Sequence, residues 1–182
     1  MSRTIAISIL VTMLATWRAA HAVDGFTLAL GQDDDEDIDR YGLAIQWEWE
    51  RQWFAAGNWY LGGFWEFGLS HWDGDRGRTG NDNLTEVGIT PVFRLQPHHP
   101  PAGGLLPFLE FGIGAHLLSD LSIDDKRFGT SLNFGSHLGA GTRFGPRHQY
   151  ELTYRFQHLS NASIKDPNRG INFHIVQLKY WC

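Results

Sequence analysis

The sequence predicts an all-β protein that forms an eight-stranded antiparallel transmembrane β-barrel. Three observations support this prediction. Runs of residues alternate between apolar and polar with a period of two, turn-rich segments separate the runs, and the chain contains 21 Gly, 8 Trp and 12 Phe. Many aromatic residues and glycines, without a long apolar segment, favour short membrane strands over membrane helices.

The first residues have the pattern of a cleaved secretory signal. Arg3 precedes an apolar run over residues 5–17 and the small-x-small sequence of residues 20–22. The apolar run is too short to cross a bilayer as a helix. We therefore expect a signal peptide over residues 1–22 and a single barrel domain over residues 23–182.

Charge and cysteine content exclude several classes of protein. Cys182 is the only cysteine, so a scaffold held together by internal disulfides is excluded. The formal net charge of −5 leaves no basic footprint, so we expect no nucleic-acid partner. We also expect no cofactor and no metal, because the pair His98-His99 has no further ligand nearby.

The first four expected strands each have one apolar and one polar face. The polar faces carry small or polar residues such as Gly42, Gln46, Glu66 and Glu86. In order along the chain, the apolar faces carry Phe26, Leu28 and Leu30; Tyr41, Leu43, Ile45, Trp47 and Trp49; Trp59, Leu61, Trp65, Phe67 and Leu69; and Val87, Ile89, Pro91, Phe93 and Leu95.

The last four expected strands repeat the division. Their polar faces carry residues such as Glu110, His116, His137 and Arg155. In order, the apolar faces carry Leu105, Leu109, Phe111, Ile113 and Leu117; Leu132, Phe134, Leu138, Ala140 and Phe144; Leu152, Tyr154 and Phe156; and Val176, Leu178 and Tyr180 within the final run over residues 171–181.

Either a soluble barrel or a membrane barrel fits these strands, and the chemistry of the faces distinguishes them. A soluble barrel has an apolar interior and a surface rich in Lys and Asp. Here the polar face is mostly Gly, Glu, Arg, Gln and His, which suits the narrow interior of an eight-stranded barrel, and the glutamates and arginines would form a network there. The other face is a continuous apolar band, as in proteins that face lipid. We favour the membrane barrel and keep a soluble ligand-binding barrel as the alternative.

The connections and the aromatic residues support the membrane barrel. Short Pro- or Gly-rich turns near residues 51–57, 97–104 and 145–148 alternate with longer polar loops, the arrangement of bacterial outer-membrane barrels. The longer loops cover residues 32–39, 73–83, 119–128 and 161–170. Aromatic residues near strand ends are expected at the membrane interfaces, namely Trp47, Trp49, Trp59, Trp72, Tyr180 and Trp181.

One expected strand changes chemistry at its end. His158 and Ser160 continue the lipid-facing side of residues 151–160, next to the outer loop 161–170. Polar side chains that face lipid are costly and are therefore functional candidates. Residues two apart are neighbours on one face, so the imidazole could act as general base for the serine hydroxyl on an ester of a lipid lying against the wall.

Asn172 is the best-placed residue to orient His158. It lies on the lipid-facing side of the next strand, at the same outer end. Its side chain is an amide, whereas the third member of such a triad is usually a carboxylate. From geometry alone, an incidental His–Ser pair stays open as the alternative.

The stretch HLSNASIKDPNRGIN resembles the PagL family of lipid A 3-O-deacylases, which are eight-stranded outer-membrane barrels. The family pattern is His-x-Ser-Asn-Ala followed by Asn-x-Gly. It matches at His158, Ser160, Asn161, Ala162, Asn168 and Gly170. The segment PFLEFGIGAHLLS also looks like the middle strand of the family. The resemblance covers the mature chain in its layout and is most specific over the last third.

The resemblance implies roles for the residues of this motif. Ser160 would be the nucleophile and His158 the general base, while Asn161 and Asn168 would lie near the oxyanion hole, with Gly170 in the same loop.

The chain departs from the family at the acid. Characterised members carry Glu where this chain has Asn172, so we expect lower activity, a substitute acid such as Asp166, or a catalytically weakened relative.

The function expected from the sequence is therefore an outer-membrane serine esterase that removes a primary (3-O) acyl chain from lipid A. Its partners would be lipid A or lipopolysaccharide and the outer membrane of a Gram-negative bacterium, and a homodimer is an arrangement that the sequence leaves open. The alternative function is a non-catalytic barrel, structural or lipopolysaccharide-binding, that has lost the triad acid.

Overall fold

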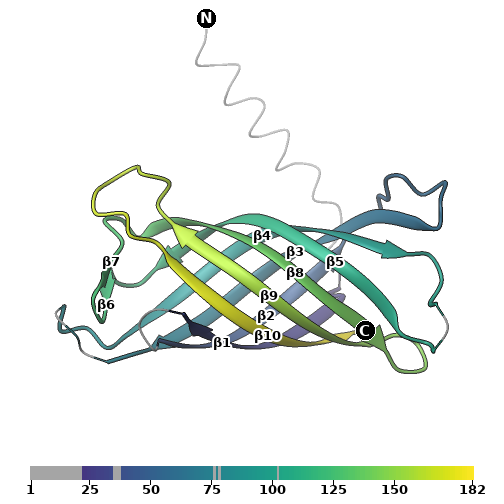
Figure 1. Cartoon of the computed structure of the whole chain (residues 1–182), viewed down its shortest axis with the longest axis horizontal. Helices are drawn as coiled ribbons and strands as arrows, with labels where there is room; N and C mark the ends of the chain where they lie inside the picture. Colours follow the sequence, from purple (N-terminus) through teal and green to yellow (C-terminus); the bar gives the residue numbers. More distant parts are fainter. Residues whose placement is uncertain (1–21, 35–37, 76, 78, 102) are drawn as a thin grey trace, which may run out of the picture.

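The computed structural model describes residues 22–34, 38–75, 77, 79–101 and 103–182. Eight long antiparallel strands close into a barrel in the order β1-β10-β9-β8-β5-β4-β3-β2, tilted against its long axis (Figure 1). The strands are β1 (Gly25–Asp33), β2 (Asp39–Glu48), β3 (Trp59–Asp73), β4 (Asn83–Pro97), β5 (Leu106–Leu118), β8 (Leu132–Phe144), β9 (Tyr150–Ser160) and β10 (Ile171–Trp181). The predicted eight-stranded antiparallel barrel is confirmed.

Two segments outside the eight strands differ in how they compare with the prediction. The connection between β5 and β8 contains a short hairpin, β6 (Ser122–Ile123) and β7 (Lys126–Arg127), which the sequence did not predict. The predicted signal peptide falls on residues 1–21 and Ala22, of which only Ala22 is described, so it stays a prediction. Within the described ranges, no helix is long and apolar enough to cross a membrane.

Side chains alternate strictly between the outside and the inside of the wall. Ile113 and Leu138 are 67% and 66% exposed on the outside, whereas their strand neighbours Gly112 and His137 lie on the inside and are buried. The outer face is apolar and the inner face polar, the reverse of a soluble barrel. The membrane barrel is therefore the correct alternative of the two.

Charged side chains of opposite sign fill the middle of the barrel. They are three cations and three carboxylates: Arg94, Arg155, Lys179, Glu66, Glu110 and Glu151. Arg94 lies 2.8 Å from both Glu110 and Glu151, and Arg155 lies 2.7 Å from both Glu66 and Glu110. Each buried charge thus has partners of the opposite sign, which offsets part of its cost of desolvation. The predicted inner network is confirmed.

A second polar group lies closer to the end of the barrel that carries β6 and β7. His116 Nδ1 lies 2.6 Å from Glu86 Oε1, and Arg40 Nε donates to Glu86 Oε2 at 3.0 Å. The imidazole ring fills the space over Gly88 and Gly135, where a methyl group on either residue would overlap it. The glycines of the inner face therefore make room for the polar side chains that fill the barrel.

Two of the aromatic residues predicted at the membrane interfaces are inside the barrel instead. Trp72 is fully buried and Trp181 is 6% exposed. Their indole N–H groups donate to Glu86 at 2.9 Å and to Glu151 at 2.8 Å. The prediction was wrong for these two residues because both occupy inward-facing positions of their strands, and a buried indole that has a carboxylate partner is well accommodated there.

The connections define two ends of the barrel. The turn end carries residues 49–58, 98–105 and 145–149 and the C-terminus, and the loop end carries the connections over residues 34–38, 74–82, 119–131 and 161–170. The hairpin β6–β7 and the loop 161–170 lie at the same end (Figure 1). The first loop is shorter than predicted because β1 and β2 pair as far as Gln32 and Asp39.

An apolar cluster closes the barrel beneath the loops. It joins the inward-facing ends of the strands to the connection between β5 and β8, and its members are Ala29, Ile38, Trp72, Leu84, Leu118, Ile123, Phe128, Leu159, Ile171, Phe173 and Ile175. We call it the loop-end cluster. Because Leu159 and Ile171 belong to it, the ends of β9 and β10 are held from the inside by packed side chains.

Candidate active site

Four polar side chains lie near one another on the lipid-facing wall at the loop end, namely Ser136, His158, Ser160 and Asn172. In the strand register, His158 of β9 lies opposite Asn172 of β10 on one side and opposite Ser136 of β8 on the other. Residues directly opposite on one face have Cβ atoms about 4.5–5.5 Å apart. Ser160 lies on the same face, one pleat closer to the loops. We call Ser136, His158 and Asn172 the polar row.

His158 is held by Asn172. The distance from His158 Nδ1 to Asn172 Oδ1 is 2.7 Å, and the contact is partly buried. Because an amide oxygen only accepts, the imidazole donates through Nδ1–H, and its Nε2 keeps a lone pair. Asp166, the alternative acid, is exposed in the loop and makes no hydrogen bond or ion pair with His158 in the described part of the chain.

The ring of His158 packs against Gly170. The φ of Gly170 is +66°, and a Cβ atom there would lie 2.8 Å from His158 Cε1 and 3.0 Å from the carbonyl oxygen of Leu159. A side chain would thus be strained by the backbone and would also push the ring away. Gly170 directly precedes Ile171, the partner of Leu159, so the Cε1–Nε2 edge of the ring leans toward the level of Ser160.

Ser160 is half-buried and is not yet bonded to His158. No hydrogen bond joins the two side chains among the residues that the structure describes. Their spacing along the strand is about 7 Å between α-carbons. The Cε1–Nε2 edge of the ring lies against Gly170, at the level of Ser160, so rotation of the serine side chain shortens this gap. Catalytic hydrogen bonds of this kind often tighten only when substrate is bound.

Asn161 and Asn168 organise the loop that follows Ser160. The backbone N–H of Asn161 donates to Asn168 Oδ1 at 2.9 Å, and its buried side-chain Nδ2 donates to the carbonyl oxygens of Phe128 and Lys165 at 2.7 and 2.6 Å. The amide protons of Asn161 are therefore in use. Asn168 Nδ2 has only a long contact of 3.4 Å with Ser163, so Asn168 keeps a donor for a ligand.

The loop is fastened to the connection between β5 and β8. Phe128, which accepts the bond from Asn161, is buried in the loop-end cluster. Gly129 follows with a φ of +68°, and a Cβ atom there would lie 2.7 Å from the carbonyl oxygens of both Lys165 and Pro167. The loop 161–170 therefore rests on residues 128–129 with backbone against backbone.

The sequence did not predict the position of Ser136 or the hydrogen bond between Asn161 and Phe128. Ser136 interrupts the apolar face of β8 between Phe134 and Leu138, but its position beside His158 depends on the register between β8 and β9. The contact of Phe128 with Asn161 links residues 33 positions apart, and no local pattern predicts it.

The comparisons with known proteins show the family and the fold of the chain. The family model described as Lipid A 3-O-deacylase (PagL) matches residues 39–181. The chain belongs to the PagL family. The relative "Lipid A deacylase PagL" of Pseudomonas aeruginosa is 32% identical over 139 residues, which are 76% of each chain. That of Bordetella bronchiseptica is 37% identical over 115 residues, 63% of this chain and 58% of the relative.

A solved PagL structure shows the same fold. The crystal structure of the outer membrane enzyme PagL superposes with a TM-score of 0.76 at 28% identity, over 87% of this chain and 99% of that chain. The family and the fold together identify the chain as an outer-membrane barrel, so the predicted location is confirmed.

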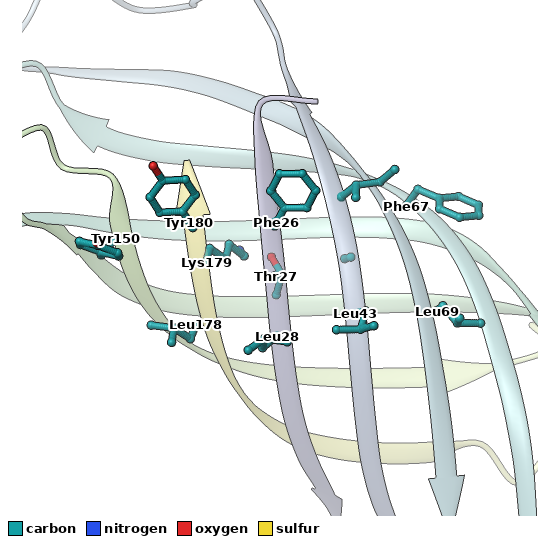
Figure 2. A pocket seen from close by; sticks show the side chains of 12 residues that line it. Phe26, Thr27, Leu28, Leu43, Phe67, Leu69, Tyr150, Leu178, Lys179 and Tyr180 are labelled. Atoms are coloured by element: carbon teal, nitrogen blue, oxygen red, sulfur yellow. The ribbon is translucent and has the colours of Figure 1, made fainter. Parts of the chain in front are cut away.

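A hollow elsewhere on the PagL-type wall has no catalytic chemistry. It has a volume of about 530 Å³ and opens on the lipid-facing side near the turn end, where Phe26, Leu28, Leu43, Leu178 and Tyr180 line it (Figure 2). Its lining is mostly apolar, with Thr27, Tyr150, Lys179 and Tyr180 as the polar members, and it contains no His–Ser pair. The candidate site is therefore the group of His158, Ser160 and Asn172 at the loop end.

The packing of the His158 ring against Gly170 can be tested with two glycines of similar φ. Gly170→Ala should lower kcat/KM for lipid A about tenfold to a hundredfold, because it displaces His158 from its position. Gly104→Ala is the matched control, since Gly104 has a φ of +72° with open space around it. Turnover of purified lipid A measures both variants. An equal loss of activity in the two would contradict the role of Gly170 in positioning His158.

Proposed function

We propose that this chain hydrolyses the 3-O-acyl ester of lipid A, with Ser160 as nucleophile and His158 as general base. The observation that supports this most strongly is the bond of 2.7 Å between His158 Nδ1 and Asn172 Oδ1, next to a serine on the same face. That bond leaves Nε2 free to take a proton from Ser160. Both curated relatives bear the name of a lipid A deacylase, which favours an enzyme over the non-catalytic barrel.

The reaction has two halves. In the first, Nε2 of His158 accepts the hydroxyl proton as Ser160 Oγ attacks the ester carbonyl, and the imidazolium then protonates the sugar oxygen that leaves. This half yields the 3-hydroxyl of the sugar and an acyl ester on Ser160. In the second half, His158 takes a proton from water, the resulting hydroxide attacks the acyl ester, and the fatty acid leaves as Ser160 regains its proton.

Asn168 is the donor that suits the developing oxyanion. Its carbonyl oxygen is fixed by the N–H of Asn161, and its amide Nδ2 is barely engaged by Ser163. The turn after Ser160 also has Ala162 and Ser163 at φ values of 52° and 61°, a conformation in which consecutive backbone N–H groups can converge on an anion. Asn161 acts indirectly, because it fixes the loop that presents these donors.

Asn172 supplies orientation without charge. In a serine protease the change from acid to amide costs about 10⁴ in turnover because the histidine adopts the wrong tautomer. Here the amide oxygen faces Nδ1, so the productive tautomer is kept and the loss should be smaller. What Asn172 cannot do is compensate the positive charge of the imidazolium, so the barrier stays higher than with a carboxylate.

The position of the site suits a lipid substrate. Longer loops face the outside in outer-membrane barrels, and by this rule we expect Ser160 at the outer headgroup boundary, where lipid A resides. A lipid lying against the wall reaches Ser160 laterally and does not need to be extracted. A homodimer, which the sequence leaves open, stays a prediction.

The catalytic assignment is tested by the lipid A of cells that express the chain. Wild type should remove one primary acyl group, and Ser160→Ala and His158→Ala should each lose the activity because each removes a group that forms or breaks bonds. Mass spectrometry of extracted lipid A measures the change. Unmodified lipid A with the wild type, or equal deacylation by all three proteins, would contradict the assignment.

The role of the amide is tested by restoring a carboxylate. Asn172→Glu should raise kcat about tenfold, because a negative charge next to Nδ1 stabilises the imidazolium. Asn172→Gln is the matched control, with the same chain length and no charge. Equal rates for the Glu and Gln variants would show that charge is not limiting, and no activity in wild type or in the Glu variant would favour the non-catalytic barrel.

A further inference from the structure

Ser136 is a hydroxyl on the lipid-facing wall for which the catalytic steps above have no use. It is exposed on the outside of β8, directly opposite His158. Its neighbours on the same face of the strand, Phe134 and Leu138, are apolar and face lipid. No hydrogen bond of its side chain occurs in the described part of the chain. An unpaired hydroxyl among apolar groups at the edge of an active site calls for a polar partner on the substrate.

The position of Ser136 along the wall relative to Ser160 indicates which polar group of the substrate it can contact. Ser160 lies opposite Phe134, and Ser136 is two residues further along β8, away from the loops. Diagonal neighbours of this kind have α-carbons about 7–8 Å apart. A substrate whose ester carbonyl contacts Ser160 therefore presents to Ser136 the first few carbons of its acyl chain.

Below this level the wall offers no other free polar group near the chain. The next row across β8, β9 and β10 consists of Leu138, Phe156 and His174. His174 Nδ1 lies 2.6 Å from the hydroxyl of Tyr154, so these two polar groups satisfy each other. Among the described residues of these two rows, Ser136 is thus the one unpaired polar side chain that lies further from the loops than Ser160 and does not belong to the catalytic group.

We propose that Ser136 is a specificity-determining residue that binds the hydroxyl on the third carbon of a 3-hydroxyacyl chain. This inference rests on the proposed function and names the acyl group that the site prefers. The hydroxyl stands two carbons from the ester carbonyl, within the span between Ser160 and Ser136. In a lipid environment the serine and the chain hydroxyl have no competing water, so their hydrogen bond favours hydroxylated over plain chains.

The test compares two synthetic substrates that differ only in this hydroxyl. They are glucosamine esters with a 3-hydroxytetradecanoyl or a tetradecanoyl chain at the 3-position, assayed with the purified full chain in detergent micelles. Wild type should prefer the hydroxylated ester about tenfold in kcat/KM, the value of one hydrogen bond that would otherwise be lost. Ser136→Ala should bring the ratio close to one, and Ser136→Thr, which keeps a hydroxyl, should preserve it.

Thr142→Ala is the matched control, since Thr142 is on the same face of β8 but far from the site, opposite Leu152. It should keep the preference of the wild type. A wild type without preference, or Ser136→Ala with an unaltered ratio, overturns the inference. So does an equal loss on both esters, which would mean that Ser136 positions His158. Ser160→Ala distinguishes failure of this inference from failure of the proposed function. If Ser160→Ala hydrolyses the esters as fast as wild type, or if wild type cleaves neither ester, the proposed function fails as well.

Discussion

The alternation of side chains across a closed, eight-stranded wall is the constraint on which the rest of the structure depends. Every residue of a barrel strand faces either lipid or a narrow interior, and moving by one position exchanges the two environments. In the middle of the wall the charged groups therefore lie at the inward-facing positions, where Arg94, Arg155 and Lys179 contact their carboxylates. His158 and Ser160 occupy the other parity, and this puts their chemistry on the lipid side.

A site on the outside of a wall has no cavity to shape it, so its rigidity must come from behind and from above. Behind it, Leu159 and Ile171 belong to the loop-end cluster, which also contains Phe128, on the inner side of the same two strands. Above it, Asn161 ties the loop to the Phe128 carbonyl. The ring of His158 is then held between Gly170 and Asn172, so in the proposed reaction these groups are arranged before the substrate arrives.

The sequence predicted what depends on parity and failed where register or packing decides. The polarity of each face, the inner ion-pair network and the shared face of His158, Ser160 and Asn172 follow from counting positions along single strands. Trp72 was assigned to the interface by residue type, although its even position on β3 turns it inward to Glu86. Ser136 and the fastening of Asn161 depend on which residues of distant segments lie opposite each other, and a single sequence holds no local signal for that.

The central claim is that Ser160, and not the serine on the other side of His158, is the nucleophile. The most direct measurement is covalent labelling with an alkyl fluorophosphonate, which reacts with an activated serine, followed by mass spectrometry of the peptides. We expect a phosphonylated Ser160 in wild type and loss of labelling in His158→Ala. Labelling of Ser136, or equal labelling of Ser160 without His158, would contradict it.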